Sequence, residues 1–297
     1  MALDHSPDHV SAPEFDLDYE TLEIKTLTPH IGAEIRGLDL SVPLSENQEA
    51  ELRRALRDWM VLVFPDQDLG PEEHKAFGRR FGPLHIHPQL RKAKMSHPEI
   101  LPVHTNADSP FTAGDGWHSD VTCDALPPLG SMLYIRETPA CGGGDTLYAN
   151  MYMAYDLLSD PMKKFLEGLT AIHDGAGPYL EQRSVGIGKF DPAEKFPQAE
   201  HPVVTRHPES GRKVLYVNAG FTTRIVGLTA TESRGILEIL FRHIESVPKL
   251  CCRVRWEPNT LTFWDNRCTQ HHAIWDYYPH SRVGGRVSIL PEEAPRA

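Results

Sequence analysis

The stretch GDGWHSDVTCD, residues 114–124, sets His118 and Asp120 two positions apart behind a glycine-rich turn. Side chains on a β-strand alternate between its two faces, so residues at i and i+2 point the same way. We therefore expect a strand that presents this histidine and this aspartate together. They would be two of the three ligands of a 2-His-1-carboxylate site for Fe(II). The alternative is a polar pair on a surface strand.

The His-x-Asp pattern is rare in this chain. Of the sixteen histidines, only His118 begins it. Three others begin His-x-Glu, but two of these contain proline, and His243 lies in a predicted helix, where i and i+2 diverge. The pair is thus singled out, but a third ligand has to come from another part of the chain.

The candidates for the third ligand are His271 and His272, which follow an apolar strand in the segment FWDNRCTQHHA. Arg282 comes eleven residues after His271, and Arg286 four residues later. A keto acid that binds a metal through two oxygens has a far carboxylate, and arginine offers that group a two-pronged partner. If the strand RVSIL pairs beside the strand of the third ligand, both arginines can face the metal. Otherwise they are solvated surface residues.

Short apolar segments bounded by proline and glycine recur along the chain. They predict strands within 22–40, 61–67, 131–139, 213–220, 251–258, 260–266 and 286–290. Amphipathic periodicity predicts helices over 45–60, 70–82, 159–169 and 229–246. Capping boxes mark two helix starts, Ser45 with Gln48 and Thr229 with Glu232. Together these segments predict a mainly β fold with flanking helices. The aperiodic segments 85–116 and 175–200 are expected to be irregular, and the first of them is expected to be a lid.

The composition narrows the classes of partner. A formal net charge of -11 argues against nucleic acid and anionic membrane surfaces, although one pocket can still be basic. The sequence contains no run of eighteen apolar residues, so it predicts no membrane-spanning helix. Five cysteines without metal-binding spacing suggest reduced thiols in a cytoplasmic protein. Residues 1–20 are expected to be a disordered leader, and 21–297 a single domain.

Seven segments in one order resemble the TauD/TfdA family of Fe(II)- and 2-oxoglutarate-dependent dioxygenases, especially the members that act on taurine. They are FGPLHIHP, WHSDVT, PPLG, GGDTLYANM, HPVV, LYVNAGFTTRIV and WDNRCTQHHA, and the resemblance spans about 22–290. It implies a double-stranded β-helix, or jelly roll, with Fe(II) at its mouth. It also implies a homo-oligomer, a dimer or a tetramer.

Position by position, the resemblance implies roles for particular residues. Iron would be held by His118, Asp120 and His271, with His272 a neighbour and not a ligand. The cosubstrate 2-oxoglutarate would be bound by Thr146, Arg282 and Arg286. The substrate would meet His87, Val121, Phe221 and Arg286, with His87 and Arg286 as a cation pair for its anionic group.

The implied reaction is hydroxylation of a small anionic substrate with O2, taurine or a related alkylsulfonate being the leading candidate. The products would be an aldehyde, sulfite, succinate and CO2. This chain departs from the taurine-acting members at several pocket positions, including Leu90 and Gly114. The same chemistry on an alkyl sulfate ester, a phosphonate or an aryloxyalkanoate therefore stays open. So do a non-oxidative metal-dependent hydrolase or isomerase on the same fold and a binding module without a metal.

Overall fold

The structure is a computed structural model, which describes residues 15, 17–87, 90, 94–112, 114–184 and 195–297. Its largest element is an eight-stranded sheet in the order β1-β2-β3-β14-β6-β16-β4, in which β5 also pairs with β16. The strands are β1 (Glu23–Thr26), β2 (Ala33–Arg36), β3 (Val61–Phe64), β14 (Thr260–Asp265), β6 (Gly130–Glu137), β16 (Arg282–Ile289), β4 (Leu84–His85) and β5 (Ile100–Thr105).

A smaller sheet packs on the large one. It consists of β13 (Cys251–Val254), β7 (Thr146–Asn150) and β15 (Thr269–Ala273). Tyr148 of β7 meets Trp264 of β14 with ring centroids 5.5 Å apart, and Ile135 of β6 belongs to the same buried cluster. The two sheets therefore share one apolar core, as in a β-sandwich.

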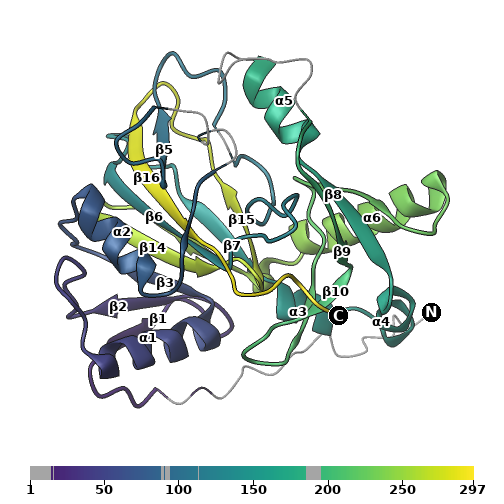
Figure 1. Ribbon diagram of the computed structural model, residues 1–297, viewed down its shortest axis with the longest axis horizontal. Helices are drawn as coiled ribbons and strands as arrows, with labels where there is room; N and C mark the ends of the chain where they lie inside the picture. Colours follow the sequence, from purple (N-terminus) through teal and green to yellow (C-terminus); the bar gives the residue numbers. More distant parts are fainter. Residues whose placement is uncertain (1–14, 16, 88–89, 91–93, 113, 185–194) are drawn as a thin grey trace, which may run out of the picture.

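A third layer lies beyond the small sheet, on the side opposite α1 and α2 (Figure 1). It contains the sheet β12 (Thr222–Ile225), β8 (Thr170–Asp174) and β9 (Gln198–Pro202), and the pair β10 (Val204–Arg206) and β11 (Lys213–Leu215). Its helices are α3 (Met151–Asp156), α4 (Asp160–Leu166), α5 (Ala176–Ser184), α6 (Ala230–Glu245) and the short 3-10 helix η2 (Pro248–Leu250).

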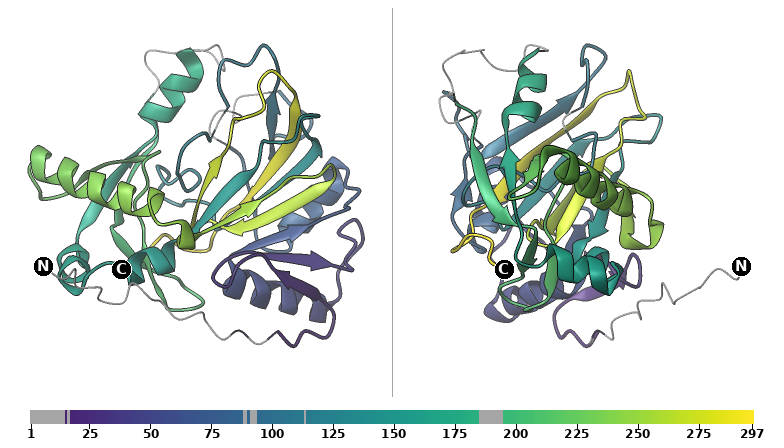
Figure 2. Two further views of the ribbon diagram at one scale, coloured as in Figure 1. Left: turned by 180° about the vertical axis from the view of Figure 1, so that it is seen from behind. Right: turned by 90° about the vertical axis from the view of Figure 1, so that its right-hand side faces the viewer.

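Helices α1 (Glu46–Trp59) and α2 (Pro71–Arg79) cover the outer face of the large sheet (Figure 2). The capping box predicted at Ser45 is present, as is the one at Thr229 that begins α6. The apolar stripe of α1 is buried as the periodicity predicts, so the amphipathic pattern correctly identified the face that packs on the sheet. The observed fold is mainly β with a few helices, which confirms the expected class.

Two expectations about irregular segments are wrong. The segment 85–116 contains β5, which pairs with β16 along its length. Pro102 hid this strand, but it sits on a strand with only one partner, the kind of strand in which proline is tolerated. The segment 175–200 contains α5 and the start of β9. The leader expected at 1–20 falls largely outside the described residues.

None of the helices in the described ranges combines the length and the apolar character that crossing a membrane requires.

Candidate metal and cosubstrate site

His118 and His271 lie directly opposite each other on paired backbones. The His118 amide donates to the His271 carbonyl at 3.1 Å, and the His271 amide donates back at 2.8 Å. His271 belongs to β15, but His118 is an isolated bridge residue, and Asp120 already lies in a turn. The strand expected through His118 and Asp120 is therefore wrong. Val121, with a left-handed φ of 51°, redirects the chain at this point.

Asp120 is held by contacts to its backbone and to its carboxylate. The Asn266 side chain accepts from the Asp120 amide at 2.7 Å and donates to its carbonyl at 3.0 Å. The side-chain amide of Asn266 also donates to the Pro128 carbonyl at 3.0 Å. Ser131 donates to Oδ2 of Asp120 at 2.8 Å, and Arg286 forms an ion pair with Oδ1. These contacts fix the carboxylate although it lies in a turn.

The two histidines and the aspartate converge on one point. Nε2 of His118 lies 3.9 Å from Oδ1 of Asp120, and Nε2 of His271 lies 3.8 Å from the same oxygen. One ligand atom from each residue can be chosen so that all three lie within 4.8 Å. Nδ1 of His118 lies 2.8 Å from the Gly116 carbonyl, so Nδ1 carries the proton and Nε2 offers its lone pair inward.

The protonation states of these groups favour metal binding. Burial opposes ionisation of Asp120, but Arg286 and then His271 and His118 outweigh it, so the pKa of Asp120 lies below its usual range. Burial lowers the pKa of His271 well below its ordinary value and lowers that of His118 as well. At neutral pH the site thus presents a carboxylate and two neutral imidazoles, the forms in which these side chains bind a metal.

Arg282 and Arg286 reach the site from the large sheet. They stand four residues apart on β16, which places them on one face. Within the described strands β16 pairs with β4, β5 and β6 and not with β15, so the strand pairing on which the sequence argument depended is absent. Arg286 nevertheless contacts Asp120, which lies in a turn outside both sheets.

Arg282 is buried beside Trp256, which in turn contacts Thr146. The Arg282 guanidinium lies 5.3 Å from the Trp256 ring centroid, and Trp256 Nε1 donates to Thr146 Oγ1 at 3.0 Å. Only 3% of Arg282 is exposed, and its Nε and Nη2 have no hydrogen-bond partner among the described residues. Burial lowers the pKa of Arg282, a sign that its charge is poorly compensated. A buried cation with unmet donors is costly unless an anion joins it.

Three of the four residues expected at the substrate, all except Arg286, lie close to one buried cluster. Val121 and Phe221 belong to a small buried cluster with Cys123 and Tyr179, and the His87 ring lies 5.8 Å from that of Tyr179. Burial, followed by the charge of Arg286, lowers the pKa of His87 to about 3. His87 is therefore neutral at neutral pH without a bound anion, so the expected cation pair contributes one charge, from Arg286.

Several residues at the site carry no local signal in the sequence. Asn266, Ser131 and Trp256 act through long-range contacts, so no local pattern could single them out. Tyr148 stacks on His271 with centroids 5.8 Å apart. His272 lies outside the cluster, as expected, since its Nε2 lies 3.0 Å from the Asp115 carboxylate.

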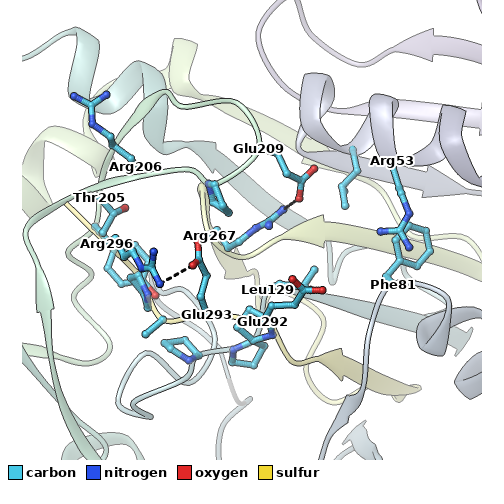
Figure 3. Close-up of a pocket in the computed structure, with 18 residues that line it drawn as sticks. Arg53, Phe81, Leu129, Thr205, Arg206, Glu209, Arg267, Glu292, Glu293 and Arg296 are labelled. Atoms are coloured by element: carbon cyan, nitrogen blue, oxygen red, sulfur yellow. Dashed lines mark ion pairs between the residues drawn. The ribbon is translucent and has the colours of Figure 1, made fainter.

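A second buried group of metal-ligand types, His207, Asp265 and Cys268, is already saturated. Asp265 accepts from His207 at 3.0 Å and from Arg267 through its amide, Nε and Nη2 at 2.6–2.9 Å. Arg267 also pairs with Glu209 beside a cavity of about 300 Å³ near the C-terminal segment (Figure 3). Both oxygens of Asp265 are occupied, so we interpret this group as an ion-pair network and not as a metal site.

Among known protein families, the sequence model of the taurine catabolism dioxygenase TauD, TfdA family matches residues 23–288 of this chain. An alpha-ketoglutarate-dependent sulfonate dioxygenase of Saccharomyces cerevisiae is 36% identical over 268 residues, which cover 86% of this chain and 63% of the yeast protein. An alkylsulfatase of Acinetobacter baylyi is 33% identical over 291 residues, which cover 92% of this chain and 86% of that protein.

Solved structures give the same result. A crystal structure of a taurine dioxygenase from Burkholderia xenovorans superposes with a TM-score of 0.77 at 34% identity. The match covers 93% of this chain and 92% of that one.

Proposed function

Because this chain belongs to the taurine catabolism dioxygenase TauD, TfdA family, we propose that its histidine–aspartate cluster binds Fe(II) and that its substrate is a small alkylsulfonate. The chain is a 2-oxoglutarate-dependent dioxygenase (alpha-ketoglutarate is the same compound). The observation that carries the finer proposal is the convergence of three ligand-type side chains, one of which contacts Arg286.

The residues present fit a ferrous ion. Two imidazole nitrogens and one carboxylate oxygen are the donor set of the Fe(II) facial triad, here contributed by His118, His271 and Asp120. When bound, Fe(II) would supply the redox chemistry that couples decarboxylation of 2-oxoglutarate by O2 to hydroxylation of a substrate carbon. The chain supplies the ligands, their protonation states and their orientation.

The cosubstrate fits the surroundings of Arg282. The unmet donors Nε and Nη2 match the far carboxylate of 2-oxoglutarate in a bidentate contact, and the Thr146 hydroxyl adjoins them through Trp256, which contacts both residues. Arg286 lies four residues from Arg282 on β16 and contacts Asp120 of the ligand cluster, and its Nε is also without a partner among the described residues. We assign Arg286 to the keto-acid head of 2-oxoglutarate and to the anionic group of the substrate.

The substrate would lie against Val121 and Phe221, with its anionic group toward Arg286 and His87. A neutral His87 still donates one hydrogen bond, and arrival of an anion would raise its pKa. The low dielectric of this buried region strengthens each of these contacts. The task of these side chains is to hold one carbon beside the metal and to exclude water.

Further features follow from the family. We propose that the large and small sheets are the two halves of a jelly roll and that 21–297 form one domain. The protein would act in the cytoplasm as a dimer or a tetramer, on a small anion and not on nucleic acid or a membrane.

The test is product release from protein prepared without oxygen and loaded with Fe(II), 2-oxoglutarate and taurine, then exposed to air. Equal amounts of succinate and sulfite would support the proposal. Succinate without sulfite would direct the search to other anions. Iron binding without either product would contradict it, and turnover without O2 would favour the hydrolase alternative.

The Acinetobacter baylyi relative is named an alkylsulfatase, so an alkyl sulfate ester is the second candidate substrate. Hydroxylation of the carbon next to the ester oxygen would release an aldehyde and sulfate. Sulfate and sulfite are readily distinguished by ion chromatography, so the same assay on a medium-chain alkyl sulfate separates the two candidates.

A further inference from the structure

Arg282 is almost fully buried, yet its Nε and Nη2 have no partner among the described residues. Because an unmet buried donor is costly, a mobile guanidinium would turn toward any oxygen within reach. The side chain therefore has to be held in place if these two donors are to stay available for a ligand. Its guanidinium lies 5.3 Å from the Trp256 ring centroid, and two further neighbours, Gly144 and Tyr277, act on the rest of the side chain.

The backbone of Gly144 comes close to the aliphatic stem of Arg282. A Cβ atom at position 144 would lie 3.1 Å from Cδ of Arg282 and 3.1 Å from Cε1 of Tyr277, tighter than most contacts of a Cβ atom. The φ of Gly144 is 73°, in the left-handed region that favours glycine. Asp276 anchors this turn, because its Oδ1 accepts from the Gly144 amide at 2.8 Å. The turn can therefore pack against Arg282 only because position 144 has no side chain.

Tyr277 is the second neighbour that supports Arg282. It is buried, and its hydroxyl lies 2.6 Å from Oγ1 of Thr105, which fixes the ring. Thr105 in turn pairs with Arg282 in the register of β5 and β16. Burial lowers the pKa of Arg282, and the phenol of Tyr277 opposes this shift, so the two side chains lie within electrostatic reach of each other.

The acidic side chain that follows this turn is engaged by another arginine. Asp145 comes directly after Gly144, and its charge also opposes the effect of burial on the pKa of Arg282. Its Oδ2, however, accepts from Nε of Arg253 at 2.5 Å. The charge of Arg282 is thus left for an anion that comes from outside the chain.

We propose that Gly144 and Tyr277 are positioning residues that hold the Arg282 guanidinium ready for the far carboxylate of 2-oxoglutarate. This inference rests on the role that the proposed function gives to Arg282. Since the side chain is already fixed, the cosubstrate does not have to order it on binding, and such preorganisation raises affinity. The support acts on the cosubstrate and not on the metal, because none of the contacts given above involves the ligand cluster.

The first experiment compares Gly144→Ala with Gly142→Ala. Both glycines have a left-handed φ, so both substitutions strain the backbone, but a Cβ atom at Gly142 would meet nothing within 4 Å. The affinity for 2-oxoglutarate is measured by titration calorimetry on the Mn(II)-loaded protein. It should fall by about 10-fold in Gly144→Ala, the usual effect of a small steric clash, and should stay at the wild-type value in Gly142→Ala. Equal losses in the two variants would assign the effect to backbone strain and overturn the inference.

The second experiment uses Tyr277→Phe, which keeps the ring and removes only the hydroxyl that contacts Thr105. The affinity for 2-oxoglutarate should fall by about 3- to 10-fold, as when one buried hydrogen bond is lost. The KM for 2-oxoglutarate in succinate release should rise by the same factor, while kcat at saturating 2-oxoglutarate stays unchanged. The affinity for Mn(II) without cosubstrate should not change in Tyr277→Phe or Gly144→Ala. A parallel loss of metal affinity would indicate a general structural role and overturn the inference.

The failure of the inference and that of the proposed function are distinguishable. Gly144→Ala and Tyr277→Phe act through Arg282, so each should have little further effect on affinity in an Arg282→Gln background, and additive losses would contradict the inference. If Arg282→Gln weakens 2-oxoglutarate binding but neither supporting variant does, the inference fails and the role of Arg282 stands. If Arg282→Gln itself leaves the affinity unchanged, that part of the proposed function fails, and the inference falls with it.

Discussion

Arg286 of the large sheet forms an ion pair with Asp120, whose Oδ1 also lies within 4 Å of both His118 and His271. One buried carboxylate oxygen is thus shared by a guanidinium and the position where we place the metal. Arg286 compensates the Asp120 charge in the structure as it stands, and a bound metal would take over part of that task.

We expect Arg286→Gln to lower the free energy of unfolding of the metal-free protein by about 3 kcal/mol, since it leaves a buried carboxylate without its cation. A bound divalent metal should restore part of this loss. Urea unfolding with chelator and with Mn(II) measures both. Arg286→Gln combined with Asp120→Asn serves as the control, because the double variant has neither charge. If Arg286→Gln lowered the free energy of unfolding equally with and without metal, Arg286 and the metal would not share the task of compensating Asp120.

Arg282→Gln should weaken 2-oxoglutarate binding by about 100-fold, as expected when one partner of a buried charge-assisted contact is lost. Titration calorimetry on the Mn(II)-loaded protein gives the dissociation constant directly. The matched control is Arg255→Gln, which removes an exposed arginine from the neighbouring segment. If the affinity were unchanged in Arg282→Gln, the cosubstrate would bind elsewhere.

Asn266→Ala should reduce metal affinity by about 10- to 100-fold without removing a ligand, since outer contacts of this kind tune metal sites by that factor. The side chain holds both the amide and the carbonyl of Asp120, so its loss frees the turn that presents the carboxylate. Competition of Fe(II) or Co(II) with a chromogenic chelator reports the affinity. Asn47→Ala, an exposed substitution on α1, should leave it unchanged.

The free energy of unfolding should fall as the pH drops below about 6.5, where an unfolded histidine begins to bind a proton. Burial lowers the pKa of His74 to about 4 and those of His87 and His173 to about 3. Between the lowered pKa values of the folded chain and the ordinary histidine pKa of about 6.5, the unfolded chain binds more protons than the folded one. The free energy of unfolding therefore rises with pH over this range.

Well inside that range each of the three histidines contributes a slope of about 1.4 kcal/mol per pH unit. Urea unfolding at about pH 7 and about pH 5 measures the difference. His74→Gln should reduce it, because glutamine can still donate to the Met132 carbonyl but does not titrate. A pH-independent free energy of unfolding over this range would contradict the prediction.

The parts of the fold that sequence reasoning predicted are those with a complete local signal. Helix α1 has a capping box and a full apolar stripe within fourteen residues, so nothing distant was needed to identify it. Strand β5 has no such signal. Its Pro102 speaks against a strand, and only the partner β16, far along the chain, makes it one.

The site divides in the same way. His118 and Asp120 were singled out by spacing, but for the wrong reason, because the structure places them at a bridge and in a turn. Arg286 and Asn266 both contact Asp120. Each lies far from Asp120 in the sequence, so no local pattern could predict these contacts.

The reciprocal backbone bonds between His118 and His271 also bear on how the protein is made. His118 and His271 are separated by more than half of the sequence. During synthesis, the two histidines cannot pair until the segment around His271 has left the ribosome. A nascent chain that ends before His271 therefore cannot assemble the three ligand-type side chains, and binding of the proposed metal has to follow synthesis of that segment.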